Sequence, residues 1–328
     1  MILVCGEALV DLFVLGEKGA RLAAEAVTGG SPFNVAIGLA RLGCPSALCT
    51  GLSTDRFGRL LTDVLNAEGV NLDYAMRTPR LTTISVVTTD RDGQPVYSFH
   101  GEGAADRNIT VADLKPELAP EIEALTFGSY TLVVEPVAAT YLALAQREAG
   151  RRTIFLDPNI RPTVIGDTRN WPSQFRRFLR TATIVKASDE DLTNAYGAAA
   201  SIANMARDWM EQGPSLVVVT RGADGAVALL GEKVLEVPGR KVEVVDTVGA
   251  GDTFSAALLA GLRRVGCLAP ERIDCLDLET LGSASAMPSS PRRSRAAAGA
   301  PTCRQPATWK PCWSARQRTR TNERSQWV

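Results

Sequence analysis

Short apolar or β-branched runs alternate with segments of helical periodicity along most of the chain, and this alternation constrains the fold more than any other feature. It is typical of a mainly parallel sheet covered by helices. The runs predicted as strands are residues 2–6, 47–51, 125–128, 154–157, 184–186 and 216–220. The segments predicted as helices are residues 34–42, 57–68, 138–149, 174–180 and 201–210. We therefore predict an α/β fold, for which 328 residues suffice as one large domain or two smaller ones.

One stretch interrupts this alternation. Residues 82–89 alternate β-branched and polar side chains, and residues 96–99 follow after Asp90-Arg91-Asp92-Gly93. An Asp-Gly step between two strand-like runs is a strong hairpin signal. Because a hairpin inserted between helices does not fit a parallel sheet, we predict a small β-sheet lid that also includes residues 9–14 and 21–27. An ordinary surface hairpin is the alternative.

The composition of the chain changes near residue 286. Residues 287–328 hold nine basic side chains and one acid, which leaves 27 of 36 basic and 35 of 36 acidic groups in residues 1–286, a net charge of −8. An acidic body argues against nucleic acid as the main partner. The basic tail, rich in Arg, Ser, Pro and Ala, resembles out-of-frame translation of GC-rich DNA, with a nucleic-acid-binding arm as the alternative.

The remaining bulk properties indicate a cytoplasmic protein. No apolar run approaches the roughly 20 residues that span a bilayer, so no membrane partner is expected. The N-terminus lacks a basic leader and reads directly as a strand. Seven cysteines without a CxxC pair favour reduced thiols over a disulfide framework.

The most informative string is Asp246-Thr247-Val248-Gly249-Ala250-Gly251-Asp252-Thr253-Phe254, which leads into an apolar helical segment. Unpaired backbone N–H groups and the positive dipole end at a helix N-terminus suit an anion. Glycine lets the backbone approach a phosphate closely. The string therefore predicts a phosphate site. Asp252 has a plain alternative as a first-turn carboxylate that stabilises the helix dipole.

This string resembles the DTxGAGD signature of the ribokinase-like (PfkB-type) carbohydrate kinases. The resemblance implies that Asp252 is the catalytic base and that Gly249, Ala250 and Gly251 form the anion hole. Phosphoryl transfer needs positioning and charge neutralisation, and a base that accepts the proton of the attacking hydroxyl. The family also implies a Rossmann-like three-layer ribokinase fold over residues 1–286, with a small β-sheet lid at about 9–28 and 70–106, and leaves 287–328 outside it.

A second string, residues 29–43, begins Gly29-Gly30-Ser31-Pro32-Phe33-Asn34. It resembles the family's GGxxxNxA signature and is typical of the fructokinase branch. The resemblance implies that Gly29, Gly30 and Asn34 contact sugar hydroxyls, although Asn34 also suits a helix cap. Asp11 matches a sugar-binding acid in relatives. The role is chemically reasonable, because a carboxylate can accept hydrogen bonds from both hydroxyls of a diol. A solvent-facing carboxylate is the alternative for Asp11.

Three further residues match substrate positions of the family. Glu135 follows a strand and is predicted to contact the sugar, with a plain loop carboxylate as the alternative. Arg161 lies in a segment like the family's DPNxR, at a strand end where ligands collect, and is predicted to face substrate or phosphate rather than a surface ion pair. Phe99 is predicted at the lid edge that covers the sugar. The sole histidine, His100, excludes most His-dependent triads and His-rich metal sites.

The nucleotide site is predicted from Thr220-Arg221-Gly222-Ala223-Asp224-Gly225, which resembles the family's TxGxxG loop. Thr220, Gly222 and Gly225 would face ATP, with a simple β-turn as the alternative. The magnesium-associated NxxE motif matches less well: Lys186 stands where Asn is common, and Asp189 or Glu190 supplies the acid. Mg²⁺ is therefore expected to be held mainly by ATP and water, and relatives commonly bind a monovalent cation such as K⁺. No Walker A or GxGxxG string follows the first strand.

The resemblance implies ATP-dependent phosphorylation of the primary hydroxyl of a ketohexose, fructose to fructose 6-phosphate. A 2-dehydro-3-deoxygluconate kinase is the first alternative, followed by kinases of ribose or nucleosides. A sugar-binding protein without turnover is the alternative from another class, because the tail replaces part of the family's adenine wall. We expect weakened ATP affinity for that reason. Lid sheets in relatives pair, which implies a possible homodimer through the lid.

Overall fold

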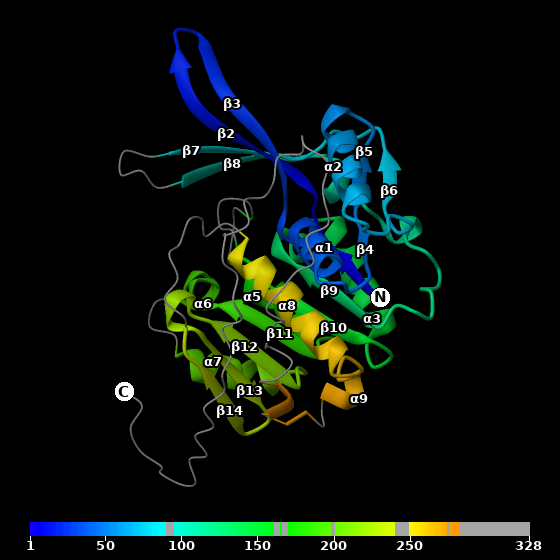
Figure 1. Cartoon of the computed structure of the whole chain (residues 1–328), viewed down its shortest axis with the longest axis vertical. Coiled ribbons are helices and arrows are strands. Elements are labelled where there is room, and N and C mark those ends of the chain that lie inside the picture. The colour runs from blue at the N-terminus through cyan, green and yellow to red at the C-terminus, as the bar shows by residue number, and fades with distance from the viewer. Residues whose placement is uncertain are drawn as a thin grey trace.

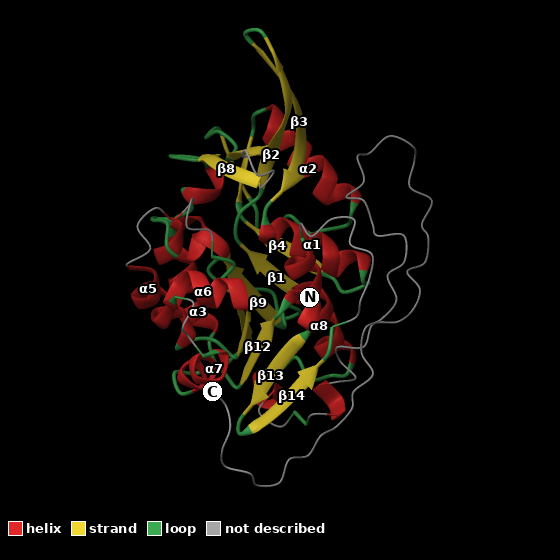
Figure 2. Cartoon of the chain, turned by 90° about the vertical axis from the view of Figure 1, so that its left-hand side faces the viewer, coloured by secondary structure: helices red, strands yellow, loops and turns green. Residues whose placement is uncertain are grey.

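A central β-sheet organises the molecule (Figures 1 and 2). The computed structural model describes residues 1–89, 95–160, 165, 170–197, 201–239, 249–273, 276–277 and 279–281. Within these residues the sheet has eight strands in the order β14-β13-β12-β11-β10-β9-β1-β4. The strands are β1 (Ile2–Cys5), β4 (Ser46–Cys49), β9 (Ala124–Gly128), β10 (Thr153–Asp157), β11 (Ile184–Ser188), β12 (Leu216–Thr220), β13 (Ala226–Leu230) and β14 (Lys233–Val237).

Six neighbouring strands of this sheet run parallel, namely β4, β1, β9, β10, β11 and β12. Strands β13 and β14 continue the sheet in antiparallel pairing. Every residue of β1, β9 and β10 is buried, as expected for strands covered by helices on both faces. Because the strands are parallel, their carboxyl ends meet at one edge of the sheet, where ligands bind in such folds. Glu7, Asp157, Ser188 and Thr220 end or follow strands at this edge.

Helices form a layer on each face of the sheet. One hydrophobic cluster includes residues of α1 (Ser31–Arg41), α2 (Arg56–Ala67), α8 (Ala250–Arg264) and α9 (Pro270–Ile273). The other includes residues of α3 (Val137–Glu148), α5 (Trp171–Leu179), α6 (Asp189–Tyr196) and α7 (Ile202–Met210). Figure 2 shows the sheet between the two layers, which confirms the predicted three-layer α/β fold class. No helix in the described residues is long and apolar enough to cross a membrane.

A second sheet stands above the first, at the top of Figure 1. It has the strand order β3-β2-β7-β8 and is built from β2 (Leu9–Lys18), β3 (Arg21–Gly29), β7 (Ile84–Thr89) and β8 (Pro95–His100). The alternating runs predicted as lid strands thus lie together in one sheet. Strand β6 (Met76–Thr78) falls inside the 70–106 range predicted for the lid, but it pairs with β5 (Gly51–Ser53) instead.

Local chemistry explains where the elements differ from their predictions. The run 47–51 divides at Thr50 into β4 and β5, which belong to different sheets. Helix α6 was not predicted, because its first residues were interpreted as a metal motif. Ser188 caps this helix through a reciprocal capping box with Asp191. Arg161 and residues 287–328 lie outside the described residues, as do Asp246, Thr247 and Val248 of the phosphate string.

Candidate active site

The residue predicted as the base, Asp252, lies in the first turn of α8, where α8 meets α1. Ser31 Oγ donates to Asp252 Oδ1 at 2.6 Å, and Asn34 Nδ2 donates to Oδ2 at 2.8 Å. Both donors are on the first turn of α1, so the two helix N-termini meet at this carboxylate. Each oxygen of Asp252 therefore has a fixed direction. Ser31 was not singled out from the sequence, because a serine after two glycines also suits a simple turn.

The backbone before Asp252 forms a turn suited to an anion. Gly249 precedes α8 in the left-handed region, with φ 77° and ψ 5°, which glycine adopts without strain. The following residues, Ala250 and Gly251, are the first of the helix, and N–H groups at such positions have no intrahelical acceptor. A Cβ on Gly251 would lie 3.1 Å from Lys186 Nζ, so a side chain there would crowd the ammonium group. The structure thus places Gly249, Ala250 and Gly251 at a helix N-terminus, and their role as an anion hole stays a prediction.

A buried polar network lies against this turn. Lys186 on β11 pairs with Asp157 at the end of β10, with 2.9 Å between Nζ and Oδ2. Ser255 Oγ lies 2.8 Å from the same carboxylate oxygen and 3.1 Å from the carbonyl oxygen of Gly251. Lys186 was predicted to be near the nucleotide. Asp157 and Ser255 were not proposed as site residues, although Asp157 opens the DPNxR-like segment.

The predicted sugar side lies where β2 and β3 of the upper sheet pass into α1. Asp11 is half-buried on β2, and burial raises the pKa of its carboxyl group. A Cβ on Gly29 would lie 2.5 Å from Asp11 Oδ2, so only glycine lets the carboxylate occupy this position. Gly30 caps α1 with φ 107°. Phe99 on β8 contacts the ring of Tyr130 edge-on, with 6.5 Å between centroids.

A cluster of buried acids lies beneath this region and was not predicted. Glu7 accepts from the backbone N–H of Ser31 at 3.2 Å, and burial raises the pKa of Glu7 to about 8. Asp106 accepts from Thr83 Oγ1 at 2.6 Å and from the Tyr130 hydroxyl, and burial raises its pKa as well. Glu7 follows β1 at the carboxyl edge of the sheet, and this position could have indicated from the sequence that Glu7 lies near the site. Asp106 lies at the end of the 70–106 range predicted for the lid.

Some predicted residues are not joined to this site. Glu135 is exposed, and its Oε2 accepts from the backbone N–H of Ala139, so it stabilises the first turn of α3. Asp189 and Glu190 are exposed on the first turn of α6, where Asp189 Oδ1 accepts from the Glu190 N–H. The buried acid of this turn is Asp191, which accepts from the Ile160 N–H at 2.6 Å. Asp191 thereby anchors the segment that follows Asp157.

The predicted nucleotide loop connects β12 to β13. Thr220 Oγ1 donates to the Ala187 carbonyl at 3.3 Å, at the carboxyl edge of the sheet. Gly222 and Gly225 have φ values of 51° and 92°, and Arg221 N donates to Gly225 O at 2.7 Å. The loop is therefore a tight turn placed on the same edge as Asp157 and Ser188. Its contact with ATP stays a prediction.

Metal ligands are sparse in the part of the chain that the structure describes. No group of three or more His, Cys, Asp and Glu side chains there is arranged to hold a metal ion. In the segment that matches the NxxE motif, Asp189 and Glu190 are exposed to solvent, whereas the side chain of Lys186 is buried. These residues do not form a direct Mg²⁺ site.

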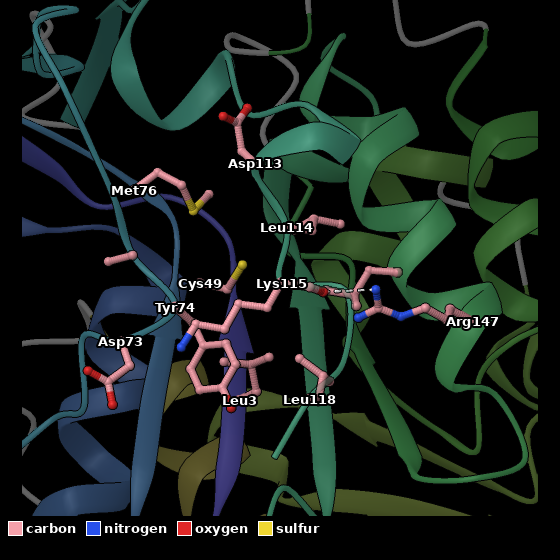
Figure 3. A pocket seen from close by; sticks show the side chains of 12 residues that line it. Leu3, Cys49, Asp73, Tyr74, Met76, Asp113, Leu114, Lys115, Leu118 and Arg147 are labelled. Carbon is pink, nitrogen blue, oxygen red and sulfur yellow. Dashed lines mark hydrogen bonds between the residues drawn. The ribbon is translucent and has the colours of Figure 1, made fainter.

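A cavity elsewhere in the molecule lies outside the predicted site. It is lined by Leu3, Cys49, Asp73, Tyr74, Ala75, Met76, Asp113, Leu114, Lys115, Leu118, Leu144 and Arg147 (Figure 3). Lys115 Nζ lies 4.6 Å from the centre of the Tyr74 ring. None of the predicted site residues lines this cavity.

Comparison with known proteins identifies the class. The family model "pfkB family carbohydrate kinase" matches residues 1–286. A fructokinase from Rhizobium leguminosarum bv. trifolii is 42% identical over 320 residues, covering 96% of this chain and 95% of the relative. The chain belongs to the pfkB family of carbohydrate kinases, as the sequence motifs predicted.

Solved structures agree with this assignment. A fructokinase from Xylella fastidiosa with bound ATP has a TM-score of 0.78 and 28% identity, covering 89% of this chain and 92% of that one. A fructokinase from Vibrio cholerae O395, bound to fructose, ADP and calcium ion, has a TM-score of 0.72 and 27% identity, with 86% and 89% covered. The predicted ribokinase-like fold is therefore confirmed.

Proposed function

We propose that this chain is an ATP-dependent fructokinase, which transfers the γ-phosphoryl group of ATP to the primary hydroxyl of fructose. The observation that carries the proposal is the Asp252 carboxylate, held by Ser31 and Asn34 at the N-terminus of α8. The Rhizobium relative is a fructokinase, and the two similar structures are fructokinases with ATP or with fructose and ADP. These names support fructose and ATP as the substrates.

The site residues have separate roles in this reaction. The sugar hydroxyl donates its proton to Asp252 as its oxygen bonds to the γ-phosphorus and the bond to the ADP oxygen breaks. Backbone N–H groups of Ala250 and Gly251 donate to the phosphate oxygens, aided by the α8 dipole. Asp11, Gly29, Gly30 and Asn34 bind the sugar. The products are fructose 6-phosphate and ADP.

In this proposal, the metal ion is held by ATP and water rather than directly by protein side chains. Mg²⁺, when bound to the ATP phosphates and water, neutralises phosphate charge. Asp189 and Glu190 would reach it only through water, because both are exposed. The same proposal includes nucleotide contacts from Thr220, Gly222 and Gly225, and it places Arg161 near the phosphate. It also includes a bound monovalent cation such as K⁺.

The upper sheet would act as a lid and as a dimer interface. Closure over the sugar excludes water and limits wasteful ATP hydrolysis. Leu15 and Leu22 are 68% and 63% exposed on the β2–β3 hairpin, which supports a homodimer through this sheet. We also place the enzyme in the cytoplasm: the described cysteines Cys5, Cys44, Cys49 and Cys267 are free thiols.

A coupled assay of ADP formation across a sugar panel tests the proposal. We expect fructose to have the highest kcat/KM, and Asp252→Asn to lower kcat by roughly 10²–10⁴-fold because no base remains. The control is Asp63→Asn, which removes an exposed carboxylate of α2 and should leave kcat unchanged. Wild-type turnover by Asp252→Asn would refute the base assignment, and turnover of another sugar alone would refute fructose.

One observation favours a second substrate class, an acidic sugar such as 2-dehydro-3-deoxygluconate. The Arg107 guanidinium lies 4.6 Å from the centre of the Tyr130 ring, the ring that Phe99 contacts. Its Nε and Nη2 are buried and have no hydrogen-bond partner among the described residues. A sugar carboxylate would satisfy these donors. If so, Arg107→Met should raise KM for the acidic sugar and not for fructose; no turnover of the acid excludes this class.

A further inference from the structure

The charge of Lys186 is buried beside the predicted phosphate site. The residue is 4% exposed on β11, and Nζ donates to Asp157 Oδ2 at 2.9 Å. Within the described part of the chain, this is its one hydrogen bond. An ammonium group has three N–H donors, so two remain for other acceptors.

The position of Nζ relative to α8 shows where these donors can act. A Cβ on Gly251 would lie 3.1 Å from Nζ, so the ammonium directly adjoins the turn that precedes Asp252. Ser255 lies one helical turn beyond Gly251 and contacts both the Gly251 carbonyl and Asp157 Oδ2. The network therefore connects the end of β10 with the first turn of α8 and keeps the ammonium beside the turn.

The charges around Lys186 keep it protonated. The carboxylates that face it are Asp157, Asp191 and Asp252, from β10, α6 and α8. Burial is the largest single influence and lowers the pKa of Lys186, but the attraction and hydrogen bond of Asp157, together with the attraction of Asp191 and Asp252, outweigh it and raise the pKa above its ordinary value. A fixed positive charge in a site shielded from water stabilises developing negative charge far more strongly than it would in water.

We propose that Lys186 is a catalytic residue, which donates to an oxygen of the transferring phosphoryl group at the Gly249–Gly251 turn, and that Asp157 and Ser255 position it. This proposal rests on the kinase function proposed above. Lys186 exchanges no proton: the hydroxyl proton goes to Asp252, the sugar oxygen gains the bond to phosphorus, and ADP leaves. The role differs from that of the magnesium-associated NxxE motif, in which Lys186 stands where Asn is common.

A pair of substitutions separates this role from a structural one. Lys186→Met alone leaves Asp157 as a buried unpaired charge and is expected to destabilise the fold. The double variant Lys186→Met/Asp157→Asn removes both charges of the pair and keeps side chains of similar size. We expect this double variant to fold, with kcat reduced by about 10²–10³-fold and with fructose KM within about 3-fold of wild type. A double variant with wild-type kcat would overturn the proposal, since neutralising Asp157 would then be the only role of Lys186.

Nucleotide binding provides a readout that needs no turnover. Calorimetric titration with ATP and with ADP should show that the double variant loses about 10-fold more affinity for ATP, because Lys186 acts on the terminal phosphate. Equal losses for both nucleotides would contradict the proposal. Failure of the wild type to phosphorylate fructose would refute the substrate assignment and leave this comparison intact.

The pH dependence of kcat gives a third measurement. The positive charge of Lys186 favours the ionised form of Asp252. The acid limb of the kcat profile should therefore move to higher pH in the double variant, compared with the otherwise matched Asp157→Asn enzyme. An acid limb that coincides in the two variants would contradict a charge that acts at the reacting centre.

Discussion

At the scale of single residues, Asp252 illustrates how the site is organised before substrate binds. Ser31 and Asn34, both on α1, each donate to one oxygen of this carboxylate, which belongs to α8. For the base role that we propose for Asp252, a carboxylate whose direction is already fixed would lose little entropy when the hydroxyl arrives, which would lower the barrier of the transfer step. The backbone N–H of Ser31 in turn donates to Glu7, so the acid cluster beneath the sugar side supports the same turn.

Glu7 provides a pH-dependent test at this scale. Burial raises its pKa from 4.5 to about 8, so the folded chain keeps a proton that the unfolded chain releases. The resulting stability is complete below pH 4.5 and is lost as the pH rises toward 8. We expect Glu7→Gln, which mimics the protonated form, to flatten this decline and to raise the free energy of unfolding at pH 8 by roughly 1–4 kcal/mol.

Urea denaturation across this pH range measures the effect. Glu25→Gln is the matched control, because Glu25 is exposed on β3. Identical pH profiles for wild type and Glu7→Gln would show that Glu7 is ionised in the folded chain.

At the scale of elements, the pairing of α1 with α8 determines what surrounds the Asp252 carboxylate. The two helices approach so closely at Gly38 that a Cβ there would lie 2.9 Å from Ala256 Cβ. This distance brings Ser31 and Asn34 within reach of Asp252. A larger side chain at the crossing would separate the helices and also loosen the carboxylate.

We therefore expect Gly38→Val to lower the free energy of unfolding by about 2 kcal/mol through overpacking. Adding Ala256→Gly should recover at least half of this loss, because the opposing methyl group is removed. Thermal and urea denaturation of the two single variants and the double variant give the coupling between the positions. Strictly additive changes would show that the two residues do not meet.

At the scale of the whole molecule, the upper sheet has little contact with the rest of the chain along β3. Residues 21–25 of this strand are all exposed, and the neighbouring β2–β3 hairpin projects from the body in Figures 1 and 2. An uncovered sheet with apolar side chains is open to pairing with another chain. This arrangement agrees with the dimer proposed for the lid.

Leu22→Lys tests this dimer, since a charge in its apolar contact should shift wild-type dimer toward monomer. Sedimentation velocity over a range of protein concentrations measures the change. Val111→Lys is the control, because Val111 is a comparably exposed apolar residue outside the lid sheet. A wild-type protein that stays monomeric at every concentration would refute the dimer.

The C-terminal tail belongs to this scale as well. The family match ends at residue 286. The alignment with the Rhizobium fructokinase covers 96% of the chain and therefore includes part of residues 287–328. Whether the tail is translated out of frame stays a prediction, which sequencing of the coding DNA tests. An ordinary ATP KM would contradict the predicted weakening of the nucleotide site.

Some of the site was predictable because its residues are consecutive. The Gly249–Asp252 turn and the Gly29–Asn34 turn each contain glycines, a helix start and a polar side chain within a few positions. Glu135, Asp189 and Glu190 show the limit of such reasoning. Each stands beside a recognisable motif, but two of them face solvent at the start of α6 and Glu135 stabilises α3. A motif specifies residue types, whereas local capping decides which carboxylate turns inward.

The sequence by itself determined the parallel core, because strands covered on both faces must be apolar throughout and separated by amphipathic helices. It also predicted a glycine turn at the start of α8, and the structure has Gly249 there in the left-handed region. Only the tertiary structure decided the surroundings of Asp252. Ser31 reaches it across 221 positions, and Ser255 reaches Asp157 across 98. Such contacts depend on how closely α1, α8 and the sheet pack, and no local pattern encodes that distance.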